Sequence, residues 1–173
     1  MTSDRKDIVG YCDGACKGNP GPGGWGAMME YTYGLSPIRW TACGGKSKTT
    51  NQEMELMGML ELLRLIDVGN DITIHSDSQF VLKGLIDGGK DGHLTIKGQT
   101  VVLTGWSKKW RDTQWLKSDG EPVKHISLWK EIISACQDHL LGGSTLHFLW
   151  VKGHNGNEGN TIADKLANRG IAL

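Results

Sequence analysis

The chain has 173 residues, a length that suits one domain with a single hydrophobic core. Hydrophobic residues make up 38% of the chain, which excludes an intrinsically disordered protein. The 19 basic and 19 acidic residues balance, so any binding of nucleic acid must depend on local patches rather than on net charge.

The sequence shows no sign of a membrane or secreted protein. No apolar run is long enough to span a bilayer, and the polar N-terminus is not a secretory signal, so we expect a cytoplasmic protein. The four cysteines lack the spacing of a disulfide framework, which indicates free thiols; a zinc site at Cys12 and Cys16 is the alternative. We find no signal for oligomerisation or for a protein partner and expect a monomer.

Three strands are predicted in the first third of the chain. A short apolar run at 8–12 ends at Asp13, and a proline-glycine turn at 18–24 follows. Further strands are predicted at 25–31 and 38–44. Together the three form an antiparallel meander.

A helix is predicted next, from about residue 50 to residue 66. Thr50 or Asn51 can cap it, and Glu53 stands where a capping box requires an acidic group. The apolar residues Leu56, Met59, Leu60 and Leu63 share one face, which we expect to be buried.

Strands and amphipathic helices alternate in the remainder. A strand at 72–75 leads to Asp77, which opens a short helix. A helix at 127–141, a strand at 146–151 and a helix at 158–171 complete the chain. This order predicts an α/β fold with a mixed sheet and helices on its faces, in one domain over 1–173.

Four acidic residues stand in unusual neighbourhoods: Asp13 in YCDGACKGNPGPGGWG, Glu55 in TTNQEMEL, Asp77 in IHSDSQF and Asp164 in VKGHNGNEGNTIADKLAN. Because ligand sites in open α/β sheets gather at strand ends, all four can meet at one edge. Each also has a purely structural explanation. Asp13 suits a turn, Glu55 a solvated helix position, Asp77 an N-cap and Asp164 a surface ion pair.

Long segments around these carboxylates favour the functional interpretation. They read DGACKGNPGPGGWG, TTNQEMELMGMLELL, IHSDSQFVLKG, PVKHISLWKEI and WVKGHNGNEGNTIADKLAN. In them, and across nearly its whole length, the chain resembles the small, free-standing type 1 ribonucleases H of bacteria and phages. The resemblance implies a ribonuclease H-like fold, in which helices flank a five-stranded mixed sheet whose first three strands are antiparallel.

The resemblance also assigns the catalytic group. It implies that Asp13, Glu55, Asp77 and Asp164 bind metal. The family pattern M-E-L selects Glu55, and because Glu53 lies about 200° away around the helix, only one of the two glutamates can face the site. His154, in the glycine-rich loop KGHNGNEGN, matches a proton carrier or product-release residue, whereas its plain alternative is a solvated side chain.

The implied activity is endonucleolytic hydrolysis of the RNA strand of RNA–DNA hybrids. The carboxylates and substrate phosphate oxygens would hold two Mg²⁺ ions, which Mn²⁺ can replace. One ion would activate the attacking water and the other would stabilise the leaving oxygen. The products would carry 5′-phosphate and 3′-hydroxyl ends.

Several residues match family positions that contact the hybrid. Cys16, Asn19, Asn51 and Gln52 match contacts in the minor groove, where the 2′-hydroxyl identifies the RNA strand. Lys48 and Thr50 match residues that hold a phosphate of the DNA strand, and Gln79 is a further candidate contact. Their plain alternatives are turn residues and helix caps.

The segment 105–129 holds four of the seven tryptophans, with five basic and three acidic residues. Such interleaving suits a nucleic-acid backbone. The resemblance implies a protruding handle over about residues 104–126 that grips the DNA strand. Trp106 and Trp110 would contact it, and Lys108, Lys109 and Arg111 would supply charge; Trp129 we expect in the core. Two acidic residues, at 112 and 119, dilute this charge, so we expect weaker or more salt-sensitive binding than in basic relatives.

The segment 86–103 departs from the bacterial pattern and is interpreted as an insertion. Its glycines and the alternation in HLTIKGQTVVL predict a loop and a small hairpin. It can extend the handle, contact nucleic acid, or be only a tolerated surface excursion, which is the default. Its position leaves the four carboxylates untouched.

Three other interpretations are compatible with parts of the sequence. A nuclease of the same fold that acts on DNA, such as a resolvase or integrase core, is disfavoured by TTNQEMEL and GNPGPGG. A catalytically silent hybrid-binding module is disfavoured by the intact carboxylates. A detached domain of a reverse transcriptase is disfavoured by the initial methionine.

Overall fold

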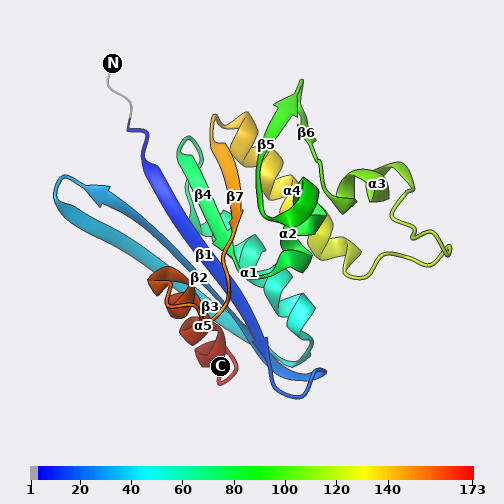
Figure 1. Cartoon of the computed structure of the whole chain (residues 1–173), viewed down its shortest axis with the longest axis horizontal. Helices are drawn as coiled ribbons and strands as arrows, with labels where there is room; N and C mark the ends of the chain where they lie inside the picture. The colour runs from blue at the N-terminus through cyan, green and yellow to red at the C-terminus, as the bar shows by residue number, and fades with distance from the viewer. Residues whose placement is uncertain (1–3) are drawn as a thin grey trace.

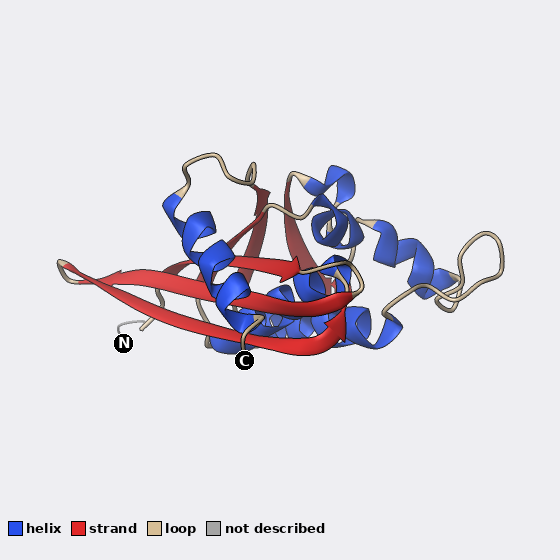
Figure 2. Cartoon of the chain, turned by 90° about the horizontal axis from the view of Figure 1, so that it is seen from below, coloured by secondary structure: helices blue, strands red, loops and turns tan. Residues whose placement is uncertain are grey.

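The computed structural model describes residues 4–173. A seven-stranded sheet in the order β3-β2-β1-β4-β7-β5-β6 forms its centre, with α5 on one face and α1 and α4 on the other (Figures 1 and 2). The strands are β1 (Asp7–Cys16), β2 (Gly21–Tyr33), β3 (Ser36–Thr49), β4 (Asp71–Ser76), β5 (Asp91–Lys97), β6 (Thr100–Val102) and β7 (Thr145–Trp150). The helices are α1 (Asn51–Leu65), α2 (Gln79–Leu85), η1 (Asp87–Gly89), α3 (Trp106–Asp112), α4 (Ile126–Leu141) and α5 (Glu158–Gly170).

The predicted antiparallel meander is confirmed, but its strands are longer than the sequence indicates. The segment 21–24, assigned to a turn, is already part of β2. Its glycines are needed because α5 approaches the strand backbone: a Cβ at Gly24 would lie 2.2 Å from the carbonyl oxygen of Ala167, and one at Gly26 2.4 Å from that of Ala163. These glycines therefore seat the last helix on the sheet.

Parallel pairing in the middle of the sheet sets the position of the acidic residues. β4 runs parallel to β1 on one side and to β7 on the other. The parallel ladder of β1 and β4 ends at the pair Cys12 and Ser76, so Asp13, which continues in β1, and Asp77, which follows β4, both come directly after that ladder. Strand ends of this kind are where α/β folds place their ligand sites.

The core confirms the helical patterns. Leu56, Met59, Leu60 and Leu63 of α1 are all buried, as is the predicted core residue Trp129 of α4. α1 packs on β1 and on α4. None of the helices in the described part of the chain is long and apolar enough to cross a membrane.

The expected count of five strands is wrong, because the insertion adds β5 and β6. The predicted hairpin is present, with Gly98 at positive φ in its turn. β5 pairs antiparallel with β7 and so continues the main sheet. Without it, β7 would be an open edge whose backbone groups lack partners, and the added pairing satisfies them. The insertion is therefore an extension of the sheet rather than a free surface loop.

Candidate metal and nucleic-acid site

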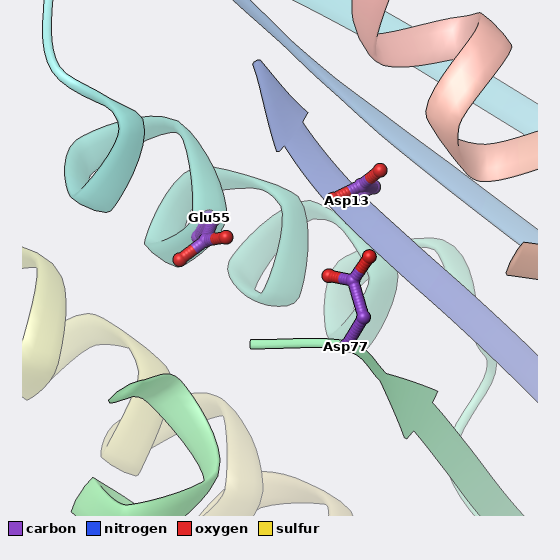
Figure 3. A group of neighbouring side chains, drawn as sticks. All are labelled: Asp13, Glu55 and Asp77. Carbon is purple, nitrogen blue, oxygen red and sulfur yellow. The ribbon is translucent and has the colours of Figure 1, made fainter. Parts of the chain in front are cut away.

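Three of the predicted carboxylates meet at one point. One carboxylate oxygen from each of Asp13, Glu55 and Asp77 lies within 4.8 Å of the other two (Figure 3). Asp13 comes from β1, Glu55 from the second turn of α1, and Asp77 from the end of β4. Residues far apart in the sequence thus form a compact set of oxygen donors.

Two glycines allow this convergence. A Cβ at Gly14 would lie 2.4 Å from the backbone nitrogen of Glu55, and one at Gly58 would lie 2.9 Å from the carbonyl oxygen of Asp13. Without side chains at these positions, α1 lies directly against the end of β1. The Asp-Gly pair that suggested a turn therefore marks a close approach of helix and strand.

Burial and mutual repulsion raise the pKa values of the three carboxyl groups. Asp13 is only 7% exposed. Burial raises its pKa, the charge of Asp77 raises it further, and the Gly14 N–H, which donates to Asp13 Oδ1 over 2.9 Å, opposes the rise. Burial also raises the pKa of Glu55, to about 7. No lysine or arginine forms an ion pair with these three carboxylates within residues 4–173.

Asp77 shares this environment. Burial raises its pKa, whereas hydrogen bonds from Asp13 and Asn160 lower it. A hydrogen bond between the carboxyl groups of Asp13 and Asp77 requires a proton on one of them. A divalent cation would replace that proton and relieve the repulsion.

Asp164, the fourth predicted carboxylate, lies beside the group on α5. Its charge raises the pKa of both Asp13 and Asp77. It is not one of the three residues whose oxygens lie within 4.8 Å of one another. The structure therefore brings three predicted ligands together and places the fourth next to them.

Two polar residues that the sequence analysis missed support these carboxylates. Ser78 is buried, and its Oγ donates to Glu55 Oε2 over 2.7 Å. The same oxygen accepts from the Val81 N–H and caps α2, so the alternative that Asp77 is the cap is wrong. Asn160 is buried one helical turn before Asp164, and its side chain lowers the pKa of Asp77. Ser78 directly follows Asp77, and Asn160 is four residues before Asp164 on the same helix face. These positions are the signal that could have identified them.

His154 stands in the loop between β7 and α5 and is exposed. Its φ of 55° is in the left-handed region, so the loop turns sharply at this residue. A positive charge on its imidazole lowers the pKa of Asp77.

The predicted minor-groove residues gather around the start of α1. Asn19 Oδ1 accepts from the Asn51 N–H over 2.9 Å. The Cys16 thiol donates to the carbonyl oxygens of Gly21 and Thr49 over 3.5 and 3.4 Å. Gln52, in the first turn of α1, is exposed. The bonds of Asn19 and Cys16 are thus those expected of their plain structural roles, and contact of these residues with a hybrid stays a prediction.

The two candidate phosphate contacts and Gln79 also have defined places. Thr50 is the N-cap of α1 and accepts from the Glu53 N–H over 3.2 Å. Lys48 is exposed near the end of β3, and Gln79 is the first residue of α2. The carboxylate of Glu53 bonds Lys46 and Thr49, so it points away from the three-carboxylate group.

The handle begins with α3 and carries a chain of aromatic rings. Trp106 is 45% exposed and lies 6.1 Å, centroid to centroid, from Trp110. Trp110 packs edge-on against buried Trp129 at 5.3 Å. Lys108 and Lys109 are exposed. Of the two predicted aromatic contacts, Trp106 offers the more accessible ring, and Trp110 anchors the handle to the core.

The insertion touches both the handle and the surroundings of the site. Arg111, expected to supply charge, donates to the carbonyl oxygen of Val101 over 3.1 Å and thereby ties α3 to β6. The Trp150 N–H donates to the carbonyl oxygen of Lys90 over 2.8 Å, and the Trp150 indole N–H donates to that of Asp77 over 3.2 Å. The insertion thus reaches the backbone of Asp77 through one tryptophan.

Comparison with known proteins adds independent information. The sequence model of the RNase H family matches residues 5–172. A ribonuclease H of Methylobacillus flagellatus is 40% identical over 171 residues, which cover 99% of this chain and 94% of that protein. The crystal structure of LC9-RNase H1, a type 1 RNase H with the type 2 active-site motif, aligns with a TM-score of 0.76 at 23% identity and covers 99% of this chain and 75% of the other. LC11-RNase H1 in complex with an RNA/DNA hybrid aligns with a TM-score of 0.56 at 20% identity, over 95% and 96% of the two chains.

Proposed function

Because the chain belongs to the RNase H family, we propose that it is a metal-dependent endonuclease that hydrolyses the RNA strand of RNA–DNA hybrids. The products would carry 5′-phosphate and 3′-hydroxyl ends, and the chain would act as a cytoplasmic monomer. The observation that supports this best is the convergence of Asp13 in β1, Asp77 just after β4 and Glu55 in the second turn of α1.

The donor set fits Mg²⁺. It consists of carboxylate oxygens, with neither cysteine nor histidine among the three residues whose oxygens converge. Asp13, Glu55 and Asp77 would hold the ions, with Asp164 completing the set from α5. When bound, the ions would supply positive charge that activates water and stabilises the leaving oxygen. Their charge would also keep the carboxylates ionised at neutral pH despite burial.

The residues around the carboxylates would orient them. Ser78 fixes one oxygen of Glu55, and the Gly14 N–H fixes one oxygen of Asp13. The side chain of Asn160 lowers the pKa of Asp77 and so favours its ionised form. Hydrogen-bonding partners of metal ligands typically set ligand orientation and affinity. His154 would carry a proton to or from the reacting groups, because one ring nitrogen of an imidazole can donate a proton while the other accepts one.

Substrate selection would come from two surfaces. Cys16, Asn19, Asn51 and Gln52 near the start of α1 would contact the minor groove and its 2′-hydroxyls. Lys48, Thr50 and the handle residues Trp106, Trp110, Lys108 and Lys109 would hold the DNA strand, with Gln79 as a further contact. The hybrid bound to LC11-RNase H1 supports such a substrate for this fold.

The test uses a strand-labelled RNA–DNA hybrid and the matching DNA and RNA duplexes, each incubated with the chain and Mg²⁺ or Mn²⁺. We expect cleavage of only the RNA strand of the hybrid, and its loss in Asp13→Asn. Cleavage of duplex DNA would instead indicate a resolvase-like nuclease. Hybrid binding without cleavage in either metal would indicate a silent module.

A further inference from the structure

A short turn in the insertion brings two lysines together beside the proposed active site. η1 follows α2, and Gly88 and Gly89 in it have positive φ values of 76° and 66°. A Cβ at Gly89 would lie 2.5 Å from Cγ of Lys83 and 3.0 Å from the backbone nitrogen of Lys83. The turn therefore lies directly against Lys83 of α2, and Lys90 is the next residue of the chain.

Lys90 is held close to Asp77 by one tryptophan. The Lys90 carbonyl oxygen accepts from the Trp150 N–H over 2.8 Å, and the Lys90 Nζ lies 5.9 Å from the centroid of the Trp150 ring. The indole N–H of the same tryptophan donates to the Asp77 carbonyl oxygen over 3.2 Å. One indole thus separates the Lys90 ammonium from the backbone of a proposed metal ligand, and attraction to the ring favours this position of the charge.

Lys83 continues the positive surface towards the handle. A cavity of about 380 Å³ is lined by residues of α2, η1 and α3, among them Lys83, Asp87, Trp106 and Lys109. α2 packs against both η1 and α3 (Figure 1). Trp106 and Lys109 are handle residues predicted to hold the DNA strand. The two lysines of α2 and the insertion therefore connect the surroundings of Asp77 with the handle.

The charge of this surface is not neutralised by ion pairs. In the described part of the chain, no ion pair involves Lys83, Lys90 or Lys109. Asp87 lines the cavity, and Asp91 follows Lys90 but is hydrogen-bonded to a histidine of β7 over 2.6 Å. Even with both carboxylates counted, the three lysines leave the surface positive.

A phosphodiester backbone is the ligand that this arrangement fits. The chain has no net charge, and the carboxylates of the proposed site repel phosphates. Positive charge beside the carboxylates is therefore needed for a nucleic acid to approach them. The lysine ammonium is a compact charge that binds phosphate, and Trp106 in the wall of the same cavity adds a ring of the kind that stacks on nucleotides.

We propose that Lys83 and Lys90 bind phosphates of the RNA–DNA hybrid between the carboxylates and the handle. This inference rests on the proposed function and adds a substrate contact to it. Lys90 belongs to the insertion, so a chain that follows the bacterial pattern without the insertion lacks this contact. Because the contacts are to phosphates, they would position the hybrid without reading its base sequence.

The test measures binding of a fluorescently labelled hybrid to the full chain carrying Asp13→Asn, in Mg²⁺ and at several salt concentrations. We expect Lys83→Gln and Lys90→Gln each to weaken binding roughly 3–10-fold and to reduce the slope of log Kd against log salt concentration by about 1. Lys90→Arg keeps the charge and should retain most of the affinity. With Asp13 intact, both glutamine variants should raise KM and leave kcat within about twofold.

Lys6→Gln is the matched control. The Lys6 Nζ also lies over an aromatic ring, 5.4 Å from the centroid of Tyr31. Lys6 precedes the start of β1, however, and is about 23 Å along the strand from Asp13. The substitution removes the same charge far from the site and should leave both the affinity and the salt dependence unchanged.

The outcomes separate this inference from the proposed function. If the unmodified chain binds and cleaves the hybrid but neither Lys83→Gln nor Lys90→Gln changes the salt dependence, the lysine contacts are overturned and the proposed function stands. Equal losses in Lys6→Gln would also overturn them, because net charge alone would then explain the effect. If the unmodified chain neither binds nor cleaves the hybrid, the proposed function fails and the lysine contacts fail with it.

Discussion

The carboxylate group and the inserted hairpin are built in opposite ways. Asp13, Glu55 and Asp77 come from distant parts of the sequence and hold partly or fully buried charges close together. The hairpin of β5 and β6 is contiguous, and its charged and polar side chains face solvent. The carboxylate group lowers the stability of the fold, and its proposed role in catalysis accounts for that loss. The hairpin extends the sheet and has no part in the proposed reaction. Substitutions in the two regions should therefore have opposite effects on activity and stability.

Replacement of the central carboxylate should give the largest effect on activity. We expect Asp13→Asn to lower kcat at least about 1,000-fold, since it removes one of the proposed metal ligands. The metal-free variant should unfold at a higher temperature than the wild type at pH 8, because one of the repelling charges is gone. Single-turnover cleavage and thermal unfolding measure the two results. If Asp13→Asn is inactive and also less stable than the wild type, the carboxylate group does not lower the stability of the fold as proposed.

Ser78→Ala should lower kcat by about 10–100-fold with a smaller change in KM, because Glu55 loses the hydroxyl that orients it. Without that hydrogen bond the pKa of Glu55 should rise further, so the activity profile should shift to higher pH. Ser78→Thr keeps a hydroxyl and should restore part of the rate. Ser107→Ala, which removes another buried hydroxyl that bonds the Gly84 carbonyl oxygen, should affect stability alone.

Substitutions in the handle should weaken substrate binding without slowing the chemical step. Trp106→Ala should raise KM for the hybrid by roughly 5–100-fold with kcat nearly unchanged, as expected for loss of one exposed stacking or contact ring. Trp110→Ala should in addition lower the unfolding temperature, since Trp110 packs on buried Trp129. Steady-state kinetics at several salt concentrations, with unfolding curves for both variants, distinguish the two tryptophans. Equal effects of both on stability would argue against the anchoring role of Trp110.

The metal-free chain should lose stability as the pH rises from about 5 to 8. The pKa of Glu55 is about 7 in the folded chain and about 4.5 when unfolded. The folded state therefore binds more protons, so the stabilisation is fully present below about pH 4.5 and lost as pH rises through 7. Thermal unfolding should show a smaller fall in Glu55→Gln and with saturating Mg²⁺. Glu61→Gln, at an ion-paired position of the same helix, should retain the wild-type dependence.

The smallest effect on activity should come from the hairpin. Val101 is 1% exposed, so Val101→Ala should lower the unfolding midpoint by a few degrees through lost packing. The rate of hybrid cleavage should stay within about twofold. Val102→Ala, at the exposed neighbouring position, is the control. A large loss of activity in Val101→Ala would contradict this separation and show that the hairpin supports the site.

Features that follow from a local sequence pattern or from a family motif could be predicted from the sequence. The apolar runs that end at Asp13 and near Asp77 predict strands, and the motifs around them predict that the two residues meet. The choice of Glu55 over Glu53 follows from the family pattern and helical geometry, and the structure places Glu53 against Lys46 and Thr49.

Features that depend on tertiary contacts could not be predicted in the same way. The alternation around Leu94 predicts a hairpin, but no local signal states that β5 pairs with β7, and this pairing makes the sheet seven-stranded. Ser78 looks like an ordinary residue beside a conspicuous aspartate until Glu55 is placed next to it. The role of Gly14 is similarly set by the approach of α1 rather than by a turn.

The added strands also change which part of the sheet is open to another chain. The outer strand on the insertion side, β6, has only three residues, whereas β3 on the opposite side has 14. An incoming strand would find a short template at β6 and a long one at β3. β3 carries Arg39, Lys46 and Lys48 along its length, and such charges oppose edge-to-edge pairing. By covering β7, the insertion leaves β3 as the long edge at which aggregation must be prevented.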